Sequence, residues 1–377
     1  MLNRLLCFVL SFIILLTCMP VVSYGADISV SAESAIVMIA ATGQVVYEKN
    51  AYEKRGMAST TKIMSSIVAL EYGDLYSEIK VSFDDINVEG TSLGLCAGDT
   101  IDLLSLIKGM LITSGNDSAN VTATLVSGGK EQFTKLMNDK ARQLGMSSTQ
   151  FMNPSGLTED GHYSTAYDMA LLGSYAIRNR VFRSICSSKS CVVSFGDPVS
   201  QRDIYNHNKF LDMYDGAFGI KTGFTKASGR CLVTAAERDG VTLVAVTLNA
   251  YDDWNDHIKM MDYGFSHVKM HSVTVDCPYV NVVGSDKSRV ETRLHKEVSL
   301  PYCDDVPSYA VNVYTQPFVY AEVHENDCLG YVDISVSDKM SVRAYLVSSE
   351  EACSYTVNSS EMTFLEKLKE FLRKGLS

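Results

Sequence analysis

Three short polar motifs, each beside an apolar stretch, constrain how this chain can fold. They are residues 59–62 (STTK), 114–116 (SGN) and 221–223 (KTG). Apolar residues at helical spacing follow the first motif, two helical runs flank the second, and the third belongs to a strand-like run. If the motifs act together, the fold must bring a helix start, a loop between two core helices and a strand edge to one place.

The first motif offers a nucleophile and a base. We expect Ser59 at the start of a buried helix, with Lys62 one turn further on the same face, so that its amine can reach the Ser59 hydroxyl. A lysine with the usual pKa of about 10.4 would be protonated, so burial beside another cation such as Lys221 must lower the pKa of Lys62. Backbone N–H groups at the helix start would stabilise an oxyanion. The alternative is that Ser59 only caps the helix and Lys62 is solvated.

The second motif forms a loop between two core helices. The apolar run 101–112 precedes it and a new helical run begins near Ser118. Such a loop is a rigid platform that aims one hydroxyl and one amide inward. Ser114 is the candidate proton shuttle to the leaving group, and Asn116 the candidate hydrogen-bond partner of Lys62 and substrate. Taken by itself, the motif is also compatible with an ordinary polar turn.

The third motif lies among predicted antiparallel strands closed by a tight turn at residues 239–240. Gly223 lets a substrate backbone approach the strand edge, Thr222 can hydrogen-bond a carboxylate that Lys221 pairs with, and the Phe224 N–H is a candidate oxyanion donor. The alternative is a plain edge strand with a solubilising lysine. Together, the three motifs supply a serine nucleophile, an amine base, a second hydroxyl and a carboxylate-binding edge, which indicates acyl transfer through a covalent serine ester.

The chain resembles the serine-type D-alanyl-D-alanine carboxypeptidases, the low-molecular-weight penicillin-binding proteins. The segments that carry this resemblance are 34–37, 47–50, 58–62, 153–157, 206–209 and 220–225. It implies that a peptidoglycan stem peptide ending in D-Ala-D-Ala acylates Ser59, that terminal D-Ala leaves, and that water completes hydrolysis. It also implies that Lys62 is the base, that Ser114 and Asn116 complete the polar centre, and that Lys221 binds the substrate carboxylate. Penicillins and other β-lactam antibiotics would acylate Ser59 as substrate mimics.

Two departures from the family pattern limit what the resemblance implies. Many relatives have His after the third motif where this chain has Phe224, so only the backbone role carries over at that position. The turn at residues 39–43 lacks the acidic residue common before it, to which we attach no chemical loss.

Two other functions compete with this interpretation. A class A-like β-lactamase would share the motifs but needs a carboxylate that activates the deacylating water, normally in Glu-x-x-Leu-Asn, a sequence that this chain does not contain. A non-catalytic peptidoglycan-binding wall protein would need neither Ser59 nor Lys62.

The chain divides into four expected segments. Residues 1–25 have the short basic start, apolar stretch and small residues of a signal peptide, so the protein is expected to be exported to the outer face of the cytoplasmic membrane or the cell wall. Residues 26–268 mix helices and strands and indicate an α/β sandwich, for which the resemblance implies the β-lactamase/transpeptidase-like type. Residues 270–357 are expected to form a small β-sandwich-like domain. Residues 360–377 form an expected amphipathic helix that anchors the protein to the membrane surface or, alternatively, packs on the β domain.

Within residues 26–268, periodicity predicts helices near Lys62 and over 101–126, 131–144, 165–179 and 253–265, with a capping box at 165–168.

Composition excludes several classes of function. The net charge of −11 gives no electrostatic footprint for nucleic acid. The seven histidines are scattered, so no metal or other cofactor is expected, and His207, near the expected site, is assigned a structural hydrogen-bonding role. Ten cysteines, two of them in the leader, leave eight that are compatible with either disulfides or free thiols; Cys186 and Cys191 could close a small loop.

Overall fold

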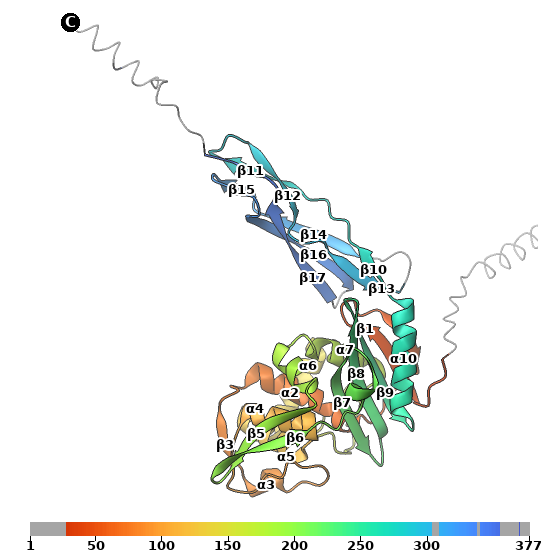
Figure 1. The fold of residues 1–377 in the computed structure, drawn as a ribbon. Coiled ribbons are helices and arrows are strands. Elements are labelled where there is room, and N and C mark those ends of the chain that lie inside the picture. Colours follow the sequence, from red (N-terminus) through yellow and green to blue (C-terminus); the bar gives the residue numbers. More distant parts are fainter. Residues whose placement is uncertain (1–27, 304–308, 338–339, 355–368, 370–377) are drawn as a thin grey trace, which may run out of the picture.

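The computed structural model describes residues 28–303, 309–337, 340–354 and 369. The signal-peptide prediction for residues 1–25 and, except at Lys369, the helix expected over 360–377 therefore lie outside the described residues. The described helices and strands form a mixed α/β part followed by a part made of strands (Figure 1). No helix among the described residues is long and apolar enough to cross a membrane.

A five-stranded antiparallel sheet forms the centre of the α/β part, in the order β2-β1-β9-β8-β7. Its strands are β1 (Ser34–Ile39), β2 (Val45–Lys49), β7 (Ala217–Thr225), β8 (Gly229–Arg238) and β9 (Val241–Ala250). The tight turn expected at residues 239–240 joins β8 to β9, and both of its residues have positive φ, as a two-residue hairpin turn requires. β7 is an edge strand, so only one of its sides is paired within the sheet.

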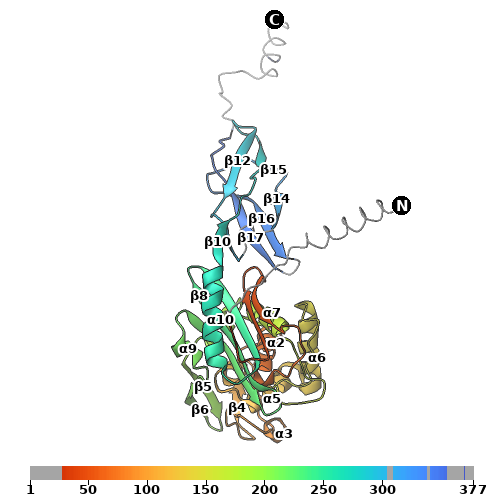
Figure 2. The same ribbon diagram turned by 90° about the vertical axis from the view of Figure 1, so that its right-hand side faces the viewer.

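Helices cover both faces of this sheet because its central strands are apolar on both faces. The bounds of the helical elements on one face are η1 Ala58–Thr61, α2 Lys62–Tyr72, α4 Leu103–Lys108, η2 Gly109–Thr113, α5 Asn116–Ser127, α6 Lys130–Gln143, α7 Ala166–Ala176 and α8 Arg180–Cys186. α10 (Asp253–His267) covers the other face and, with residues 28–32 before β1, forms a separate apolar core (Figures 1 and 2). Val244 packs in the first core and its neighbour Leu243 in the second, as strand alternation dictates.

A smaller sheet lies beside the helices on the first face. Its order is β3-β4-β5-β6, formed by β3 (Glu78–Lys80), β4 (Thr100–Asp102), β5 (Ser190–Gly196) and β6 (Val199–Tyr205). Two short helices complete this part: α3 (Phe83–Ile86) contacts α5, and α9 (Phe210–Met213) contacts β7 of the central sheet.

The predicted helices lie where the structure has helices, but one predicted helical run is divided into shorter elements. The expected capping box is present, since the Thr165 hydroxyl accepts a hydrogen bond from the Asp168 N–H before α7. The single apolar run expected over 101–112 is instead divided into the end of β4, α4 and a π-helical turn, η2. Asp102 divides this run, because its side chain accepts a hydrogen bond from Ser105 N–H and starts a new helix there.

Strands alone make up the described secondary structure from residue 269 to residue 354. One sheet has the order β14-β16-β17-β12-β11-β15, and β10 pairs with β13 in a second. The bounds are β10 Lys269–Ser272, β11 Tyr279–Val283, β12 Arg289–Leu294, β13 Ser299–Tyr302, β14 Ala310–Thr315, β15 Phe318–Tyr320, β16 Cys328–Ser337 and β17 Met340–Ser348. In both views this part lies beyond the end of α10, away from the helices of the first face (Figures 1 and 2).

Candidate active site

The three sequence motifs meet in one hollow of about 410 Å³ on the α/β part. It forms where η1 packs against β7 and β8, next to the loop that joins η2 to α5. The motif residues that line it are Ser59, Ser114, Thr222, Gly223 and Phe224, and the other lining residues are Thr91, His207, Arg230, Asp253 and Trp254.

Ser59 lies in a single 3₁₀ turn, η1, and the α-helix begins only at Lys62. The turn is fixed from within, because the Thr60 and Thr61 hydroxyls donate to the carbonyl oxygens of Met57 and Ala58 at 2.6 and 2.8 Å. A side chain at Gly156 would have to lie 2.0 Å from the Ala58 carbonyl oxygen. The loop around Gly156 therefore packs directly against the turn that presents the nucleophile.

Lys62 is fully buried, and each of its polar contacts is short. Its Nζ donates to Asn116 Oδ1 at 2.7 Å and to the Ser155 carbonyl oxygen at 2.6 Å, and lies 3.1 Å from Ser59 Oγ. A carbonyl oxygen can only accept a hydrogen bond, so these two acceptors take both hydrogens of a neutral amine. The remaining lone pair then faces the Ser59 hydroxyl, which is the geometry of a base beside its nucleophile.

The pKa of Lys62 lies well below its usual value. Burial is the main cause, the positive charge of nearby Lys221 is the second, and the carboxylate of Asp117 acts in the opposite direction. Lys221 is itself buried, and burial lowers its pKa to about 7. Burial and the positive charge of Lys221 thus both favour the neutral form of Lys62.

Asn116 is held in one orientation by main-chain groups. Its Nδ2 donates to the Glu89 carbonyl oxygen at 2.7 Å, so its Oδ1 must face Lys62. Its backbone N–H donates to the Thr91 carbonyl oxygen at 2.7 Å. These bonds connect the second motif to the loop that borders the hollow.

Asp117 also holds the loop before β4 in place through hydrogen bonds, a role that the sequence motifs did not indicate. Its buried carboxylate accepts hydrogen bonds from the Ser92 hydroxyl and from the N–H groups of Leu93, Gly94 and Leu95. The acidic side chain follows SGN directly in the sequence, but nothing local indicates that its partners lie more than twenty residues earlier.

Ser114 adopts a left-handed conformation, with φ of +62°, at the end of η2. Ser114 lies on the wall of the hollow. A left-handed conformation is uncommon for a non-glycine residue and is often found at functional sites. The position fits the predicted proton shuttle, whose role stays a prediction.

Lys221 is on strand β7, but its side chain is buried and does not line the hollow. It is 2% exposed, and its Nζ donates to the Thr222 carbonyl oxygen at 2.9 Å. Arg230, on the neighbouring strand β8, is the cation that lines the hollow. Its Nε and Nη2 contact Oδ1 of the buried Asp253 at 2.8 and 2.6 Å. Sequence reasoning did not single out Arg230, because no motif contains it.

Three further residues contribute to the site although little or nothing in the sequence near them indicates it. Ser155 and Glu89 act through main-chain carbonyls, which any residue possesses. His207 lines the hollow, where its imidazole can contact a ligand, and its backbone N–H donates to the Ile112 carbonyl oxygen at 3.4 Å. Burial, together with the charge of Lys221, lowers the pKa of His207. Among the described residues, no cluster of histidine, cysteine or acidic side chains is suited to hold a metal.

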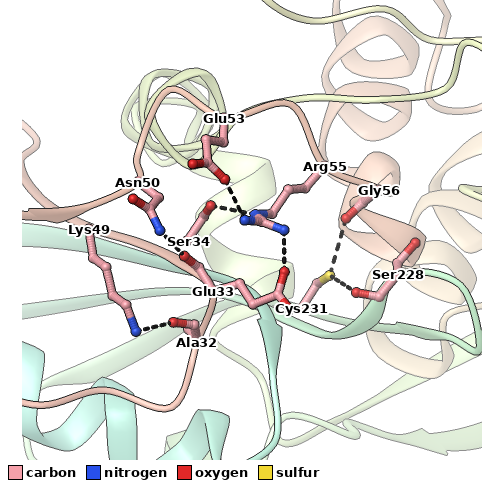
Figure 3. A network of polar contacts seen from close by, with 10 residues as sticks. All are labelled: Ala32, Glu33, Ser34, Lys49, Asn50, Glu53, Arg55, Gly56, Ser228 and Cys231. Carbon is pink, nitrogen blue, oxygen red and sulfur yellow. Dashed lines mark hydrogen bonds and ion pairs between the residues drawn. The ribbon is translucent and has the colours of Figure 1, made fainter.

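The segment that leads into η1 is fastened to the sheet by a polar network (Figure 3). Arg55 contacts Glu33, Glu53 and the Ser34 hydroxyl, which ties it to the start of β1. Cys231 on β8 lies directly opposite Gly223 and directs its thiol at the Gly56 carbonyl oxygen, 3.6 Å away. Burial raises the pKa of this thiol to about 12. The network holds the nucleophile turn against the edge of β7.

All eight cysteines of the described residues are free thiols, including Cys186 and Cys191, for which a small disulfide loop had been one alternative.

We predict that Gly223→Ala lowers the rate of Ser59 acylation by about 10²-fold, since misplacing reacting groups by an ångström can have that effect. A Cβ at this position would lie 3.0 Å from the backbone nitrogens of Ser59 and Thr60 and must displace the nucleophile turn or β7. The rate is measured with a fluorescent penicillin.

Gly264→Ala is the matched control for this prediction. Its Cβ would meet the Leu243 side chain at 2.6 Å in the opposite core. It should lower the melting temperature without changing the acylation rate. Equal acylation rates in the two variants would contradict the prediction.

Comparison with known proteins shows which family this chain is similar to. The family model described as D-alanyl-D-alanine carboxypeptidase matches residues 21–252. The D-alanyl-D-alanine carboxypeptidase DacF of Bacillus subtilis is 32% identical over 256 residues, which is 65% of each chain, so this chain spans slightly less than two thirds of that relative. DacC of Escherichia coli is 31% identical over 336 residues, 82% of each chain.

Solved structures share the fold. The D-alanyl-D-alanine carboxypeptidase of Mycobacterium tuberculosis H37Rv superimposes with a TM-score of 0.61 at 31% identity, covering 64% of this chain and 95% of the other. DacD of Francisella tularensis has a TM-score of 0.62 at 25% identity and covers 89% of this chain and 97% of its own. The second match extends into the strands that follow residue 268.

Proposed function

Because this chain belongs to the D-alanyl-D-alanine carboxypeptidase family, we propose that it removes the terminal D-alanine from peptidoglycan stem pentapeptides through an acyl-enzyme on Ser59. The observation that carries this proposal is the contact of the buried Lys62 amine with Ser59 Oγ, 3.1 Å apart, with two carbonyl oxygens taking the amine's hydrogens. A structural lysine in this position would be expected to have a carboxylate partner, as Lys140 has in Glu71.

The reaction follows from this geometry. Lys62 takes the proton of the Ser59 hydroxyl while Ser59 Oγ attacks the carbonyl of the penultimate D-alanine. The N–H groups of Ser59 and Phe224 are the proposed donors to the oxyanion. Ser114 passes the proton to the leaving amine, and D-alanine departs. Water then attacks the ester carbonyl and gives a proton to the Lys62 amine, which returns it to Ser59 Oγ as the shortened peptide leaves, so that both side chains are regenerated.

Substrate is proposed to lie along the unpaired edge of β7, as an added strand. Thr222 and Arg230 line the hollow and are suited to bind the terminal carboxylate, whereas Lys221 is buried and acts through its charge. Asp253 holds Nε and Nη2 of Arg230, so Nη1 is the part of the guanidinium that this ion pair leaves available.

We predict that Arg230→Gln raises KM for a pentapeptide with a free carboxylate by about tenfold or more, the worth of one hydrogen bond to a charged group. For the same peptide ending in an amide, the KM is expected to be higher in the unaltered protein and to change little in Arg230→Gln. Both constants are measured from product release.

Arg238→Gln is the matched control, because Arg238 is on the same strand but stacks on Tyr214 outside the hollow. If Arg230→Gln raised KM equally for the acid and the amide peptides, Arg230 would not be binding the terminal carboxylate.

The experiment that tests the proposed function measures D-alanine release from a defined pentapeptide, together with labelling by fluorescent penicillin. The proposal expects D-alanine release, a long-lived penicillin adduct, and loss of both in Ser59→Ala. Rapid turnover of the penicillin would indicate the β-lactamase alternative, and absence of labelling would indicate the non-catalytic wall protein. Labelling of Ser59→Ala would show that the nucleophile is assigned wrongly.

The proposal includes the division of the chain into an exported catalytic domain over 26–268, a small β domain over 270–357 and a membrane-surface helix over 360–377. The β domain is supported by two apolar clusters drawn only from residues of this region, with Val280 and Val332 among their buried members. Export is supported by the family, whose members act on cell wall peptidoglycan.

Truncation tests the proposed anchor. Removing residues 359–377 is expected to release the protein from the membrane fraction without changing its activity on soluble pentapeptide, because the catalytic hollow is formed entirely by earlier residues. Retention of the truncated protein in the membrane pellet would contradict the anchor.

A further inference from the structure

A second hollow, of about 330 Å³, opens on the six-stranded sheet of the C-terminal region. Tyr314, Tyr331 and Tyr345 contribute to its wall, together with Thr315 and Gln316. None of its lining residues is an acidic or basic residue. The hollow belongs to neither the catalytic residues nor the elements that position them.

The three tyrosines face the same side of the sheet because they are in register on adjacent strands. Tyr314 on β14 lies opposite Tyr331 on β16, which lies opposite Tyr345 on β17. The next residues along the strands, such as Val332 and Leu346, point to the opposite face and form the apolar core there. Tyr314 is 47% and Tyr345 56% exposed, so about half of each side chain is accessible to a ligand.

The central rings are held in place before any ligand binds. Asp333 accepts hydrogen bonds from Nε and Nη2 of Arg343 at 2.7 and 2.8 Å. The Arg343 guanidinium lies over the Tyr331 ring, 4.0 Å from its centre, and Tyr314 stacks on the same ring with centres 5.0 Å apart. Fixed rings lower the entropy cost of binding a ligand against them.

A β-bulge shapes the hollow beside these rings. The pairing of β16 with β17 shifts between Cys328 and Gly330, which leaves an extra residue on β16. A Cβ at Gly330 would lie 2.2 Å from the Tyr314 carbonyl oxygen, so glycine is required for β14 to pass this closely. The hollow is therefore part of the folded sheet and not a gap between loose side chains.

We propose that this hollow binds a saccharide, namely the glycan strand of the cell wall polymer. A saccharide presents apolar C–H faces and a rim of hydroxyl and acetamido groups, which match aromatic faces flanked by phenol, hydroxyl and carboxamide groups. The absence of acidic and basic residues from the lining favours a neutral ligand over a charged peptide or an anionic lipid surface. It also disfavours the chain's own segment 360–377, which is rich in Lys and Glu.

Binding of this kind would hold the catalytic hollow near the peptides attached to the same glycan and raise their effective concentration. The choice of the wall glycan rests on the proposed function, whereas saccharide binding itself does not.

The test titrates chitotetraose, a neutral oligomer of N-acetylglucosamine, into the full chain and follows binding by calorimetry. Saturable binding is expected, with Tyr345→Ala and Tyr314→Ala each weakening it about tenfold, the upper range for one aromatic contact. Arg343→Ala should weaken binding less, because it only frees the Tyr331 ring. Tyr320→Ala is the matched control, since Tyr320 is 70% exposed on β15 and outside the hollow.

Three results would overturn the proposal: no saturable binding by the unaltered chain, equal binding by Tyr345→Ala, or loss of self-association in Tyr345→Ala measured by sedimentation, which would make the face an interface between copies. Penicillin labelling of Ser59 is recorded for each variant and is expected to be unchanged. Failure of labelling in the unaltered chain would count against the proposed function, and failure of chitotetraose binding alone would count against this site.

Discussion

Lys62→Met is expected to lower the rate of penicillin acylation at Ser59 by about 10³-fold, within the range that general base catalysis contributes. Methionine fills a similar volume, but it has no basic nitrogen. The Ser59 hydroxyl then loses its proton acceptor, while the oxyanion donors proposed at Ser59 and Phe224 remain. The rate is followed by stopped-flow fluorescence with excess penicillin, and thermal unfolding shows whether the fold is kept.

Lys140→Met is the matched control, because Lys140 is also buried, at 4% exposure, and lies in the same domain. Burial lowers the pKa of Lys140, but the ion pair of its amine with Glu71 outweighs burial, so the pKa is raised and the charged form is favoured. Its loss should destabilise the protein and leave acylation within about twofold, since general base catalysis needs a neutral amine in contact with the nucleophile. If Lys62→Met acylated at the normal rate, another group would have to be the base.

Lys221→Met is expected to shift the acidic side of the pH profile of acylation, where the rate falls, to higher pH. The positive charge of Lys221 is one cause of the low pKa of Lys62. As pH falls through about 7, Lys221 gains its charge and opposes protonation of Lys62. Without Lys221, Lys62 gains its proton at a higher pH, so acylation fails earlier as the solution is acidified. The measurement is the rate of acylation by penicillin over a pH range of about two units on each side of the Lys221 pKa of about 7.

The same substitution should change how stability depends on pH. The folded-state pKa of Lys221 is about 7, below the usual value of 10.5, so between these values the unfolded chain binds more protons. The unfolding free energy of the unaltered protein should therefore rise with pH in this window by up to about 1.4 kcal/mol per unit from this group. Lys221→Met should lack this contribution in urea unfolding. Identical pH slopes, or an unmoved acylation limb, would show that Lys221 is not the titrating neighbour.

Local patterns predicted the elements that present the chemistry. Lys62 lies three residues after Ser59, and this spacing alone brings the amine to the hydroxyl across one helical turn. The third motif was expected on an edge strand, and β7 is at the edge of its sheet. Helical periodicity placed α10 correctly, although the helix runs two residues beyond the predicted end at 265.

Features that depend on distant segments were not predicted. The Ser155 carbonyl, 93 residues after Lys62, and the Glu89 carbonyl, 27 residues before Asn116, have no residue-type signal because they belong to the main chain. The positive φ of Ala58 was also unexpected, since alanine has no preference for it; Gly156 and Gly223 of β7 pack closely against this residue. Lys221 was expected both to lower the pKa of Lys62 and to contact the substrate carboxylate, and its burial, which favours the electrostatic role over the contact, carried no local signal.

The sequence by itself determined which reactive groups the chain carries and which of them are neighbours, because the period of a helix or strand converts spacing into proximity. The sequence required a neutral Lys62 for the chemistry, but only the tertiary structure supplied the burial and the neighbouring charge that produce one. The pKa of Lys62 is set by removal of water and by a second amine from a strand far away in the chain. Both effects arise from how densely unrelated segments pack around one nitrogen atom, and no local pattern records that density.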